Sequence, residues 1–209
     1  MVFRKAKELP FLPLIENLSG LAWEISSDGM KRLSEVDESG DSLFRNAHEF
    51  YRDALKPGPS LEDLTTKFLS YLQKGFDEYE AKPPSDISFN YWSKIMLGTA
   101  STNAVMGPKF LQDHPGLLPS VWLVDRGFFF FVNRVPRMFA KKNYQARDRV
   151  LAALRDYFSD PKNKEGSAPM IWDRADQMYE KGMTLKDVAA YTYSAYNVSY
   201  FSLVDKKTK

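Results

Sequence analysis

The residues best suited to chemistry in this sequence are its two histidines, His48 and His114, because imidazole binds metals and moves protons near neutral pH. They lie far apart in the chain, and neither has an Asp, Glu or second His at the spacing of zinc ligands. The sequence around His114, Asp113-His114-Pro115, is typical of a loop. A Ser/His/Asp triad lacks the Gly-x-Ser-x-Gly sequence that would position its nucleophile. We therefore predict no metal site and no catalytic histidine.

His48 and Arg52 lie one helical turn apart, so they share one face of any helix that contains them. Glu49 precedes Arg52 by three residues, which predicts a surface ion pair of small energetic value. A solvated, charged helix face is the simplest interpretation of this segment.

The chain contains no cysteine. This excludes, within these residues, a disulfide, a thiolate nucleophile, an iron–sulfur cluster and a cysteine-ligated zinc site. The 29 basic and 27 acidic residues are interspersed and give a net charge of +2. Proteins that bind nucleic acid usually carry a basic face and a high net positive charge, so we predict no nucleic-acid partner.

Helical periodicity dominates the pattern, and alternation at period two never persists. We predict an all-α fold of about eight helices with little or no sheet. The predicted helices cover approximately residues 14–25, 42–55, 60–76, 88–106, 117–135, 145–158, 171–181 and 184–200.

Local signals set several helix ends. Ser60 with Asp63, and Thr184 with Asp187, match capping-box variants at helix starts. Proline and glycine mark the breaks at residues 57–59, 82–84 and 107–108. Residues 29 and 34–41 are predicted to form a polar loop, and residues 136–144 a basic connector.

Burial is predicted from the same pattern. Arg147 is placed on the polar side of its helix, and Phe128 to Phe131 are expected mostly in the core, with an alternative role beside an entry route for substrate. Small residues at 98–104 favour close helix packing. The helix from Thr184, poor in charge, is predicted to be the most buried.

Seven short segments have an order and spacing found together in one enzyme family. They are residues 54–61 (ALKPGPSL), Tyr91-Trp92, and residues 99–108 (TASTNAVMGP), 122–131 (WLVDRGFFFF), 135–137 (VPR), 144–149 (YQARDR) and 189–197 (AAYTYSAYN). They resemble the cytochrome P-450 (haem-thiolate) monooxygenases, in particular the fungal branch related to sterol 7-hydroxylases and prostacyclin synthase. The resemblance spans residues 11–197, from about the family's C helix to the start of its I helix.

The resemblance implies one partial P-450 helical domain over residues 1–209, with a divergent polar tail at 198–209. The family's Glu-x-x-Arg helix and cysteine loop have no counterpart, so we expect a truncated member. Haem-thiolate oxidation needs electron donation from the thiolate. We therefore expect no cofactor for this chain alone, although full-length relatives bind haem.

The family also implies roles for individual residues. Basic side chains of its C helix hold a haem propionate, which makes His48 and Arg52 the cofactor-binding candidates, with Arg52 preferred for its bidentate geometry. Asn197 matches a small-x-Asn pattern of the I helix and is the vestigial catalytic candidate. The residues that follow, Val198-Ser199-Tyr200, depart from the family pattern.

Three functions stay open at this point. The first is a P-450-like protein from a fungal secondary-metabolite or steroid-type oxidation pathway that lacks haem catalysis by itself. The second is a haem-free helical module that binds a hydrophobic small molecule or a protein partner, with a cofactor-free cyclase or isomerase as a special case. The third is a gene-model product without independent function.

No apolar run approaches the roughly 20 residues of a membrane-spanning helix. The basic residues between Arg134 and Lys142 predict peripheral contact with an anionic membrane. We accordingly expect a cytoplasmic protein at the surface of the endoplasmic reticulum. Exposed core surface in a partial fold predicts self-association.

Overall fold

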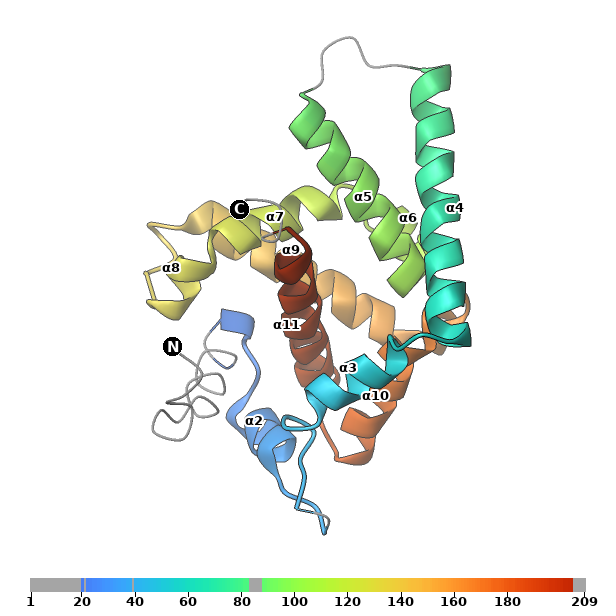
Figure 1. The fold of residues 1–209 in the computed structure, drawn as a ribbon. Coiled ribbons are helices and arrows are strands. Elements are labelled where there is room, and N and C mark those ends of the chain that lie inside the picture. The colour runs from blue at the N-terminus through green and yellow to red at the C-terminus, as the bar shows by residue number, and fades with distance from the viewer. Residues whose placement is uncertain (1–19, 21, 39, 83–87, 205–209) are drawn as a thin grey trace, which may run out of the picture.

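The fold is all-α, as predicted (Figure 1). The computed structural model describes residues 20, 22–38, 40–82 and 88–204, apart from the side chains of His48 and residues 195–204. Within this part of the chain there is no strand, and the helices are α2 (Ser27–Ser34), α3 (Ala47–Ala54), α4 (Pro59–Ala81), α5 (Phe89–Met106), α6 (Pro108–Asp113), α7 (Leu117–Arg126), α8 (Phe128–Val132), α9 (Lys141–Ser159), the 3₁₀ helix η2 (Pro161–Lys164), α10 (Pro169–Glu180) and α11 (Leu185–Val204).

The helix predicted at residues 14–25 lies largely outside the described residues; residues 20, 22 and 23 are helical, and residues 24 and 25 are not. The other predicted helices are all present, but the sequence pattern missed α2 and α6 and joined α7 with α8.

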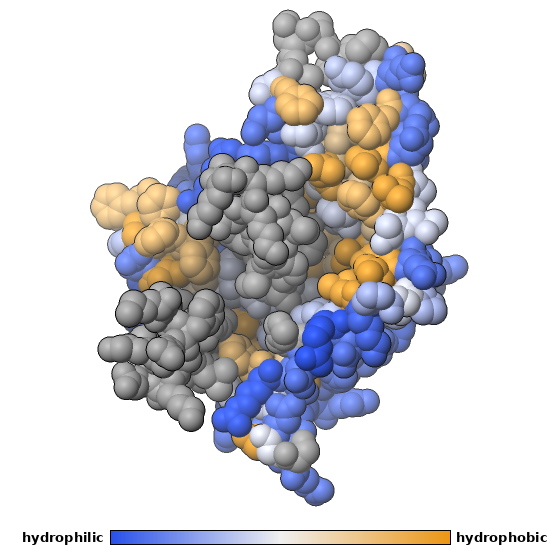
Figure 2. All heavy atoms as spheres, viewed as in Figure 1, coloured by the Kyte–Doolittle hydropathy of each residue, from blue (hydrophilic) through white to orange (hydrophobic). Residues whose placement is uncertain are grey.

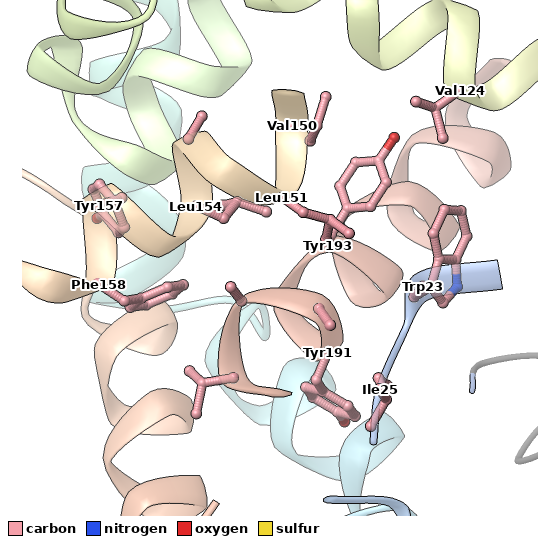
Figure 3. Packing of buried hydrophobic residues seen from close by; sticks show 14 of the residues in the cluster. Trp23, Ile25, Val124, Val150, Leu151, Leu154, Tyr157, Phe158, Tyr191 and Tyr193 are labelled. Carbon is pink, nitrogen blue, oxygen red and sulfur yellow. The ribbon is translucent and has the colours of Figure 1, made fainter. Parts of the chain in front are cut away.

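The core is built around α9, which packs against α7 and α11, while α10 packs against α11. Nine residues of α9 are buried, including Val150, Leu151, Leu154, Tyr157 and Phe158. Figure 3 shows these side chains in one buried cluster with Tyr191 and Tyr193 of α11, and Leu151 lies next to Tyr193 in this view. The first half of α11 is buried as predicted, because its small and apolar residues face several helices at once.

The start of α11 is fixed by the predicted cap. The Thr184 hydroxyl accepts a hydrogen bond from the Asp187 backbone N–H at 3.2 Å and donates one to the Asp187 carboxylate at 2.6 Å. That carboxylate is buried and also accepts hydrogen bonds from the backbone N–H and hydroxyl of Ser26, at 2.7 and 3.0 Å. One aspartate therefore joins α11 to the segment before α2.

The loop predicted at Gly29 is wrong, because Gly29 lies inside α2. Ser26 is the N-cap of this helix and accepts a hydrogen bond from the Gly29 backbone N–H at 2.9 Å. The glycine allows close approach, since a Cβ at this position would lie 2.7 Å from Cγ of Asp187. The contact partner lies far along the chain, so local sequence gave no sign of it.

Helices α4 and α5 form a hairpin that projects from this core (Figure 1). None of the 23 residues of α4 is buried, although its predicted apolar stripe is present. The predicted Ser60 cap is wrong: the helix begins at Pro59, which suits the first helical position because proline lacks an N–H. Figure 2 shows apolar residues gathered over α4 and α5 on the visible face.

The second half of α5 leaves the hairpin and enters the core. Its buried residues are Gly98, Ala100, Thr102, Ala104 and Met106, which confirms the predicted close packing through small side chains. A Cβ on Gly98 would lie 3.4 Å from a Leu118 methyl, so α5 and α7 approach closely there. Gly107, at a φ of 82°, ends α5 as predicted, and α6 starts at once with Pro108.

The start of α9 differs from the prediction in two ways. The predicted connector at 136–144 is shorter, because α9 already begins at Lys141. Arg147, predicted on the polar side of this helix, is only 3% exposed. Its guanidinium packs over the rings of Phe131 and Tyr144, each at 4.9 Å from the ring centroid, so aromatic neighbours bury it.

Candidate functional site

The sequence-predicted pair of His48 and Arg52 lies on α3. The Arg52 side chain is 57% exposed and lies 3.9 Å from the Glu49 carboxylate and 3.6 Å from that of Asp53. The His48 side chain lies outside the described residues. Arg52 therefore occupies a solvated helix face, and binding of an anionic group by the pair stays a prediction.

A different arginine, which the sequence analysis missed, lies close to α3. Arg174 of α10 is 2% exposed and has no carboxylate partner among the described residues. Its guanidinium donates to the side chains of Asn46, Gln177 and Tyr191 at 3.0, 2.9 and 3.1 Å, and to the Leu43 carbonyl. These neutral acceptors come from three parts of the chain, so Arg174 holds the segment before α3 against α10 and α11.

Aromatic rings complete the surroundings of Arg174. The guanidinium lies 5.0 Å from the Phe50 ring centroid and 5.6 Å from that of Tyr191. Burial, and secondly the neighbouring Tyr191, raise the pKa of the Tyr51 phenol well above its usual range. Tyr51 is therefore a neutral phenol at physiological pH, and this region is a structural junction without an acid–base pair.

These residues do not fit a haem by themselves. A P-450 haem needs a cysteine thiolate, and the sequence contains no cysteine. Arg52 pairs with its own helix neighbours, and four donor contacts of Arg174 are taken by protein acceptors. Within the described residues, no group of three or more potential metal-ligating side chains occurs.

Asn197, the vestigial catalytic candidate, lies in the second half of α11, but its side chain is outside the described residues. One turn earlier, the Ser194 hydroxyl donates to the Tyr191 carbonyl at 2.8 Å. That bond is a local helix contact of a common kind. A catalytic role for Asn197 therefore stays a prediction.

A small apolar cavity of about 20 Å³ lies where α11 meets α5, α6, α7 and α9. Its lining residues are Thr102, Met106, Phe110, Leu111, Leu117, Leu118, Val121, Val150, Leu154, Thr192 and Tyr193. Pockets for organic ligands usually enclose roughly 300–1,000 Å³. The cavity is therefore too small for an organic substrate without movement of these helices.

The aromatic run at α8 is divided between core and solvent. Phe131 is 2% exposed, and Phe128 packs against Trp23 at 5.5 Å between ring centroids, whereas Phe129 is 77% exposed. The connector after α8 exposes Met138 and Phe139 at 78% and 74%. The expected placement of this run mostly in the core therefore holds for Phe131 and Phe128, whereas Phe129 and Phe130 are exposed because α8 is short and covers one side only.

Comparison with curated proteins finds two fungal relatives. The chain is 26% identical over 133 residues to the cytochrome P-450 monooxygenase nodJ of Hypoxylon pulicicidum, a match covering 63% of this chain and 26% of that protein. It is 26% identical over 88 residues to the cytochrome P-450 monooxygenase poxD of Penicillium oxalicum, covering 42% of this chain and 18% of that protein. The matched regions thus span about a quarter of these relatives or less.

No family model matches the chain, and no solved structure matches it. The similarity to P-450 monooxygenases therefore rests on these two distant, partial matches. None of the described helices is long and apolar enough to span a membrane.

Proposed function

We propose that this chain forms part of the helical framework of a fungal P-450-type monooxygenase that oxidises an apolar secondary metabolite or steroid-type compound. The observation that carries the proposal is the match to nodJ over 133 residues, more than half of this chain. On this proposal the chain is one helical domain that corresponds to the region from the C helix to the I helix of the family.

In such an enzyme, haem held by a thiolate supplies the activation of oxygen. The 209 residues contain no thiolate donor, so we assign none of that step to them. Their part is to frame the space beside α11, where the buried apolar side chains of α5, α7 and α9 converge.

Two experiments test this function. The first is sequencing of the transcript that encodes these residues: an in-frame Glu-x-x-Arg segment and cysteine loop downstream support the proposal. The second is titration of the purified chain with haem, followed by visible absorption. We expect no thiolate-type spectrum of the ferrous–CO complex, and an Arg52→Ala variant should behave as the wild type. A thiolate-type spectrum from the chain alone would contradict our assignment.

A haem-free module that binds a protein partner or a second copy is the alternative, and the α4–α5 hairpin favours it. Its exposed apolar side chains are Leu69, Phe76, Tyr79, Phe89, Tyr91 and Leu97. Exposed apolar surface of this kind often marks an interaction site. Small-molecule binding by the same module has a simpler test, since apolar ligands that bind near Trp92 should change its fluorescence saturably.

Peripheral membrane contact is proposed at the connector between α8 and α9. Met138 and Phe139 are exposed directly after Arg137, an arrangement of apolar and basic groups that suits a membrane surface. Flotation with vesicles tests it: a Met138→Asp, Phe139→Asp double variant should lose binding that the wild type shows.

A further inference from the structure

A second concave surface lies between the segment before α2 and the start of α9. It is a shallow depression of about 340 Å³, largely open to solvent, and is lined by Glu24, Phe131, Arg134, Val135, Pro136, Arg137, Tyr144 and Arg147. Three guanidinium groups line it, and those of Arg137 and Arg147 pair with Glu24 and Asp148, so only Arg134 has no carboxylate partner among the described residues. We call this surface the arginine pocket.

The backbone of the arginine pocket is unusual at two positions. Glu24 has a φ of 62° and Arg134 a φ of 52°. Among the described residues, these are the non-glycine residues with positive φ, and both line this pocket. Such conformations are unfavourable for residues with a Cβ and concentrate at functional sites. The fold therefore bears a conformational cost to bring these two side chains here.

Arg147 forms the buried wall of the pocket. Its side chain is 4% exposed, and its guanidinium pairs with the Glu24 carboxylate and donates to the Ala22 carbonyl at 3.2 Å. The buried Nε of Arg147 has no acceptor among the described residues. The Asp148 carboxylate lies 3.9 Å from the same guanidinium, so two carboxylates compensate a deeply buried cation whose hydrogen bonds are incomplete.

Arg137 and Arg134 form the outer wall. Arg137 lies over the Tyr144 ring at 5.0 Å, donates to Asp148 at 2.8 Å, and lies 3.4 Å from Glu24. Arg134 is exposed and makes no ion pair with any of the described residues. The positive charge of this side is therefore only partly compensated.

We propose that the arginine pocket binds the phosphate group of an organic phosphate monoester. Near pH 7 such a group carries a charge of about −1.5 to −2, so it is attracted to the unpaired Arg134 and can share donors of Arg137. Planar guanidinium forks also suit phosphate oxygens, and Val135 and Pro136 offer apolar contact to the organic part.

Glu24 sets the strength of this site. Its carboxylate contacts both Arg147 and Arg137, so it competes with the phosphate for their donors. Phosphate binding is centred on Arg134 and Arg137, while Glu24 keeps Arg147 in place. A neutral side chain at position 24 removes this competition, while Arg137 keeps its ion pair with Asp148.

Binding is tested with phenyl phosphate and the intact chain by isothermal titration calorimetry. We expect saturable binding that Arg134→Ala, Arg137→Ala weakens by about tenfold or more, because charge-assisted hydrogen bonds are lost. The matched control is Lys67→Ala, Lys74→Ala on α4, which removes the same charge far from the pocket and should leave binding unchanged. The proposal is overturned if neither phenyl phosphate nor vesicles that contain phosphatidic acid bind. It is also overturned if the arginine variant binds as the wild type does, or if the control variant loses as much binding.

Glu24→Gln gives an independent test. We expect this variant to bind phenyl phosphate severalfold more tightly and to gain more thermal stability from it than the wild type does. Weaker binding to a folded Glu24→Gln variant overturns the proposal. If the variant does not fold without ligand, refolding on addition of phenyl phosphate supports it, and failure to refold overturns it.

A lipid headgroup is the other source of the same chemistry, and vesicles of phosphatidylcholine with phosphatidic acid identify it. Binding of phenyl phosphate indicates a soluble ligand. The ligand is a lipid headgroup if the chain binds these vesicles but not phenyl phosphate. In that case the arginine variant loses vesicle binding, and the Met138→Asp, Phe139→Asp variant keeps it. Vesicle binding that is kept in the arginine variant overturns the assignment.

Discussion

Helices α9 and α4 have similar lengths, 19 and 23 residues, but nine residues of α9 are buried and none of α4. Both have an apolar stripe with helical spacing. Helix α9 lies between α7 and α11, whereas α4 packs mainly on α5. An amphipathic pattern therefore predicts a helix and identifies its apolar side. It does not determine whether another helix packs against that side and buries it.

The largest expected difference in the free energy of unfolding is between alanine variants of two tryptophans, one in the core and one in the hairpin. Trp172 of the core is 5% exposed, donates from its ring N–H to the Tyr157 hydroxyl at 3.0 Å, and packs on Phe158. Trp172→Ala should lower the free energy of unfolding by about 3–5 kcal/mol. Trp92→Ala in the hairpin should cost about 1 kcal/mol, because it removes ring contacts that are only partly buried.

Urea denaturation of both variants measures these costs. If Trp172→Ala and Trp92→Ala lowered the free energy of unfolding equally, the core and the hairpin would not differ in burial. That result would indicate that the hairpin is buried in solution.

Two glycines give the next contrast. Gly29→Ala would place a Cβ 2.7 Å from Cγ of the buried Asp187, so we expect a loss of about 1–3 kcal/mol from overpacking. A Cβ at Gly75 of α4 would meet the flexible end of Met96 at 2.8 Å, which can move. Gly75→Ala should therefore be neutral or stabilise by up to about 1 kcal/mol through helix propensity. Thermal unfolding of the two variants measures these changes in stability. A destabilised Gly75→Ala variant would show that the contact between α4 and α5 is rigid.

A smaller effect concerns the pH dependence of stability. Burial raises the pKa of Asp125 in α7 above its usual value, although Arg126 and Lys94 oppose the shift. The folded state then holds a proton that the unfolded state releases, so this carboxyl destabilises the protein as pH rises through its raised pKa. In Asp125→Asn the free energy of unfolding should no longer fall as the pH rises from acid to neutral for this reason.

The measurement is the free energy of unfolding of wild type and Asp125→Asn between about pH 4 and pH 7, since ordinary Asp pKa values lie near 3.9. Glu80→Gln on exposed α4 is the matched control and should leave the profile unchanged. Parallel profiles for wild type and Asp125→Asn would refute the explanation.

The smallest effect on stability is expected on the hairpin surface. Leu69 and Leu97 are 55% and 49% exposed. Replacing both by Lys should change the free energy of unfolding by less than about 0.5 kcal/mol. Sedimentation velocity should show less self-association than for the wild type. A strong loss of stability in this variant would mean that another surface already covers the hairpin.

Local signals predicted much of the fold. The Thr184–Asp187 cap, the end of α4 at Ala81 and the small residues of α5 are determined by near neighbours, and the structure confirms them. Gly29 and Arg147 were misplaced because their environments depend on distant partners. Asp187 lies against Gly29, and Arg147 pairs with Glu24, over a hundred residues earlier in the chain.

The candidate sites were less predictable. Arg52 was found by its spacing and by family resemblance, yet on α3 it faces its own acidic neighbours. The arginine pocket brings Glu24 together with a connector and the first turns of α9. Sequence showed the basic character of residues 134–142, but the positive φ angles of Glu24 and Arg134 are properties of the fold.

The bond between Ser26 and Asp187 has a consequence for synthesis on the ribosome. The two residues are separated by 161 positions, so the earlier one emerges long before its partner exists. At about 5–20 residues per second, the wait lasts on the order of 10–30 seconds. The α4–α5 hairpin pairs neighbouring segments and needs no such delay. During translation Ser26 therefore cannot form this bond until most of the chain has been made, whereas both helices of the hairpin are available much earlier.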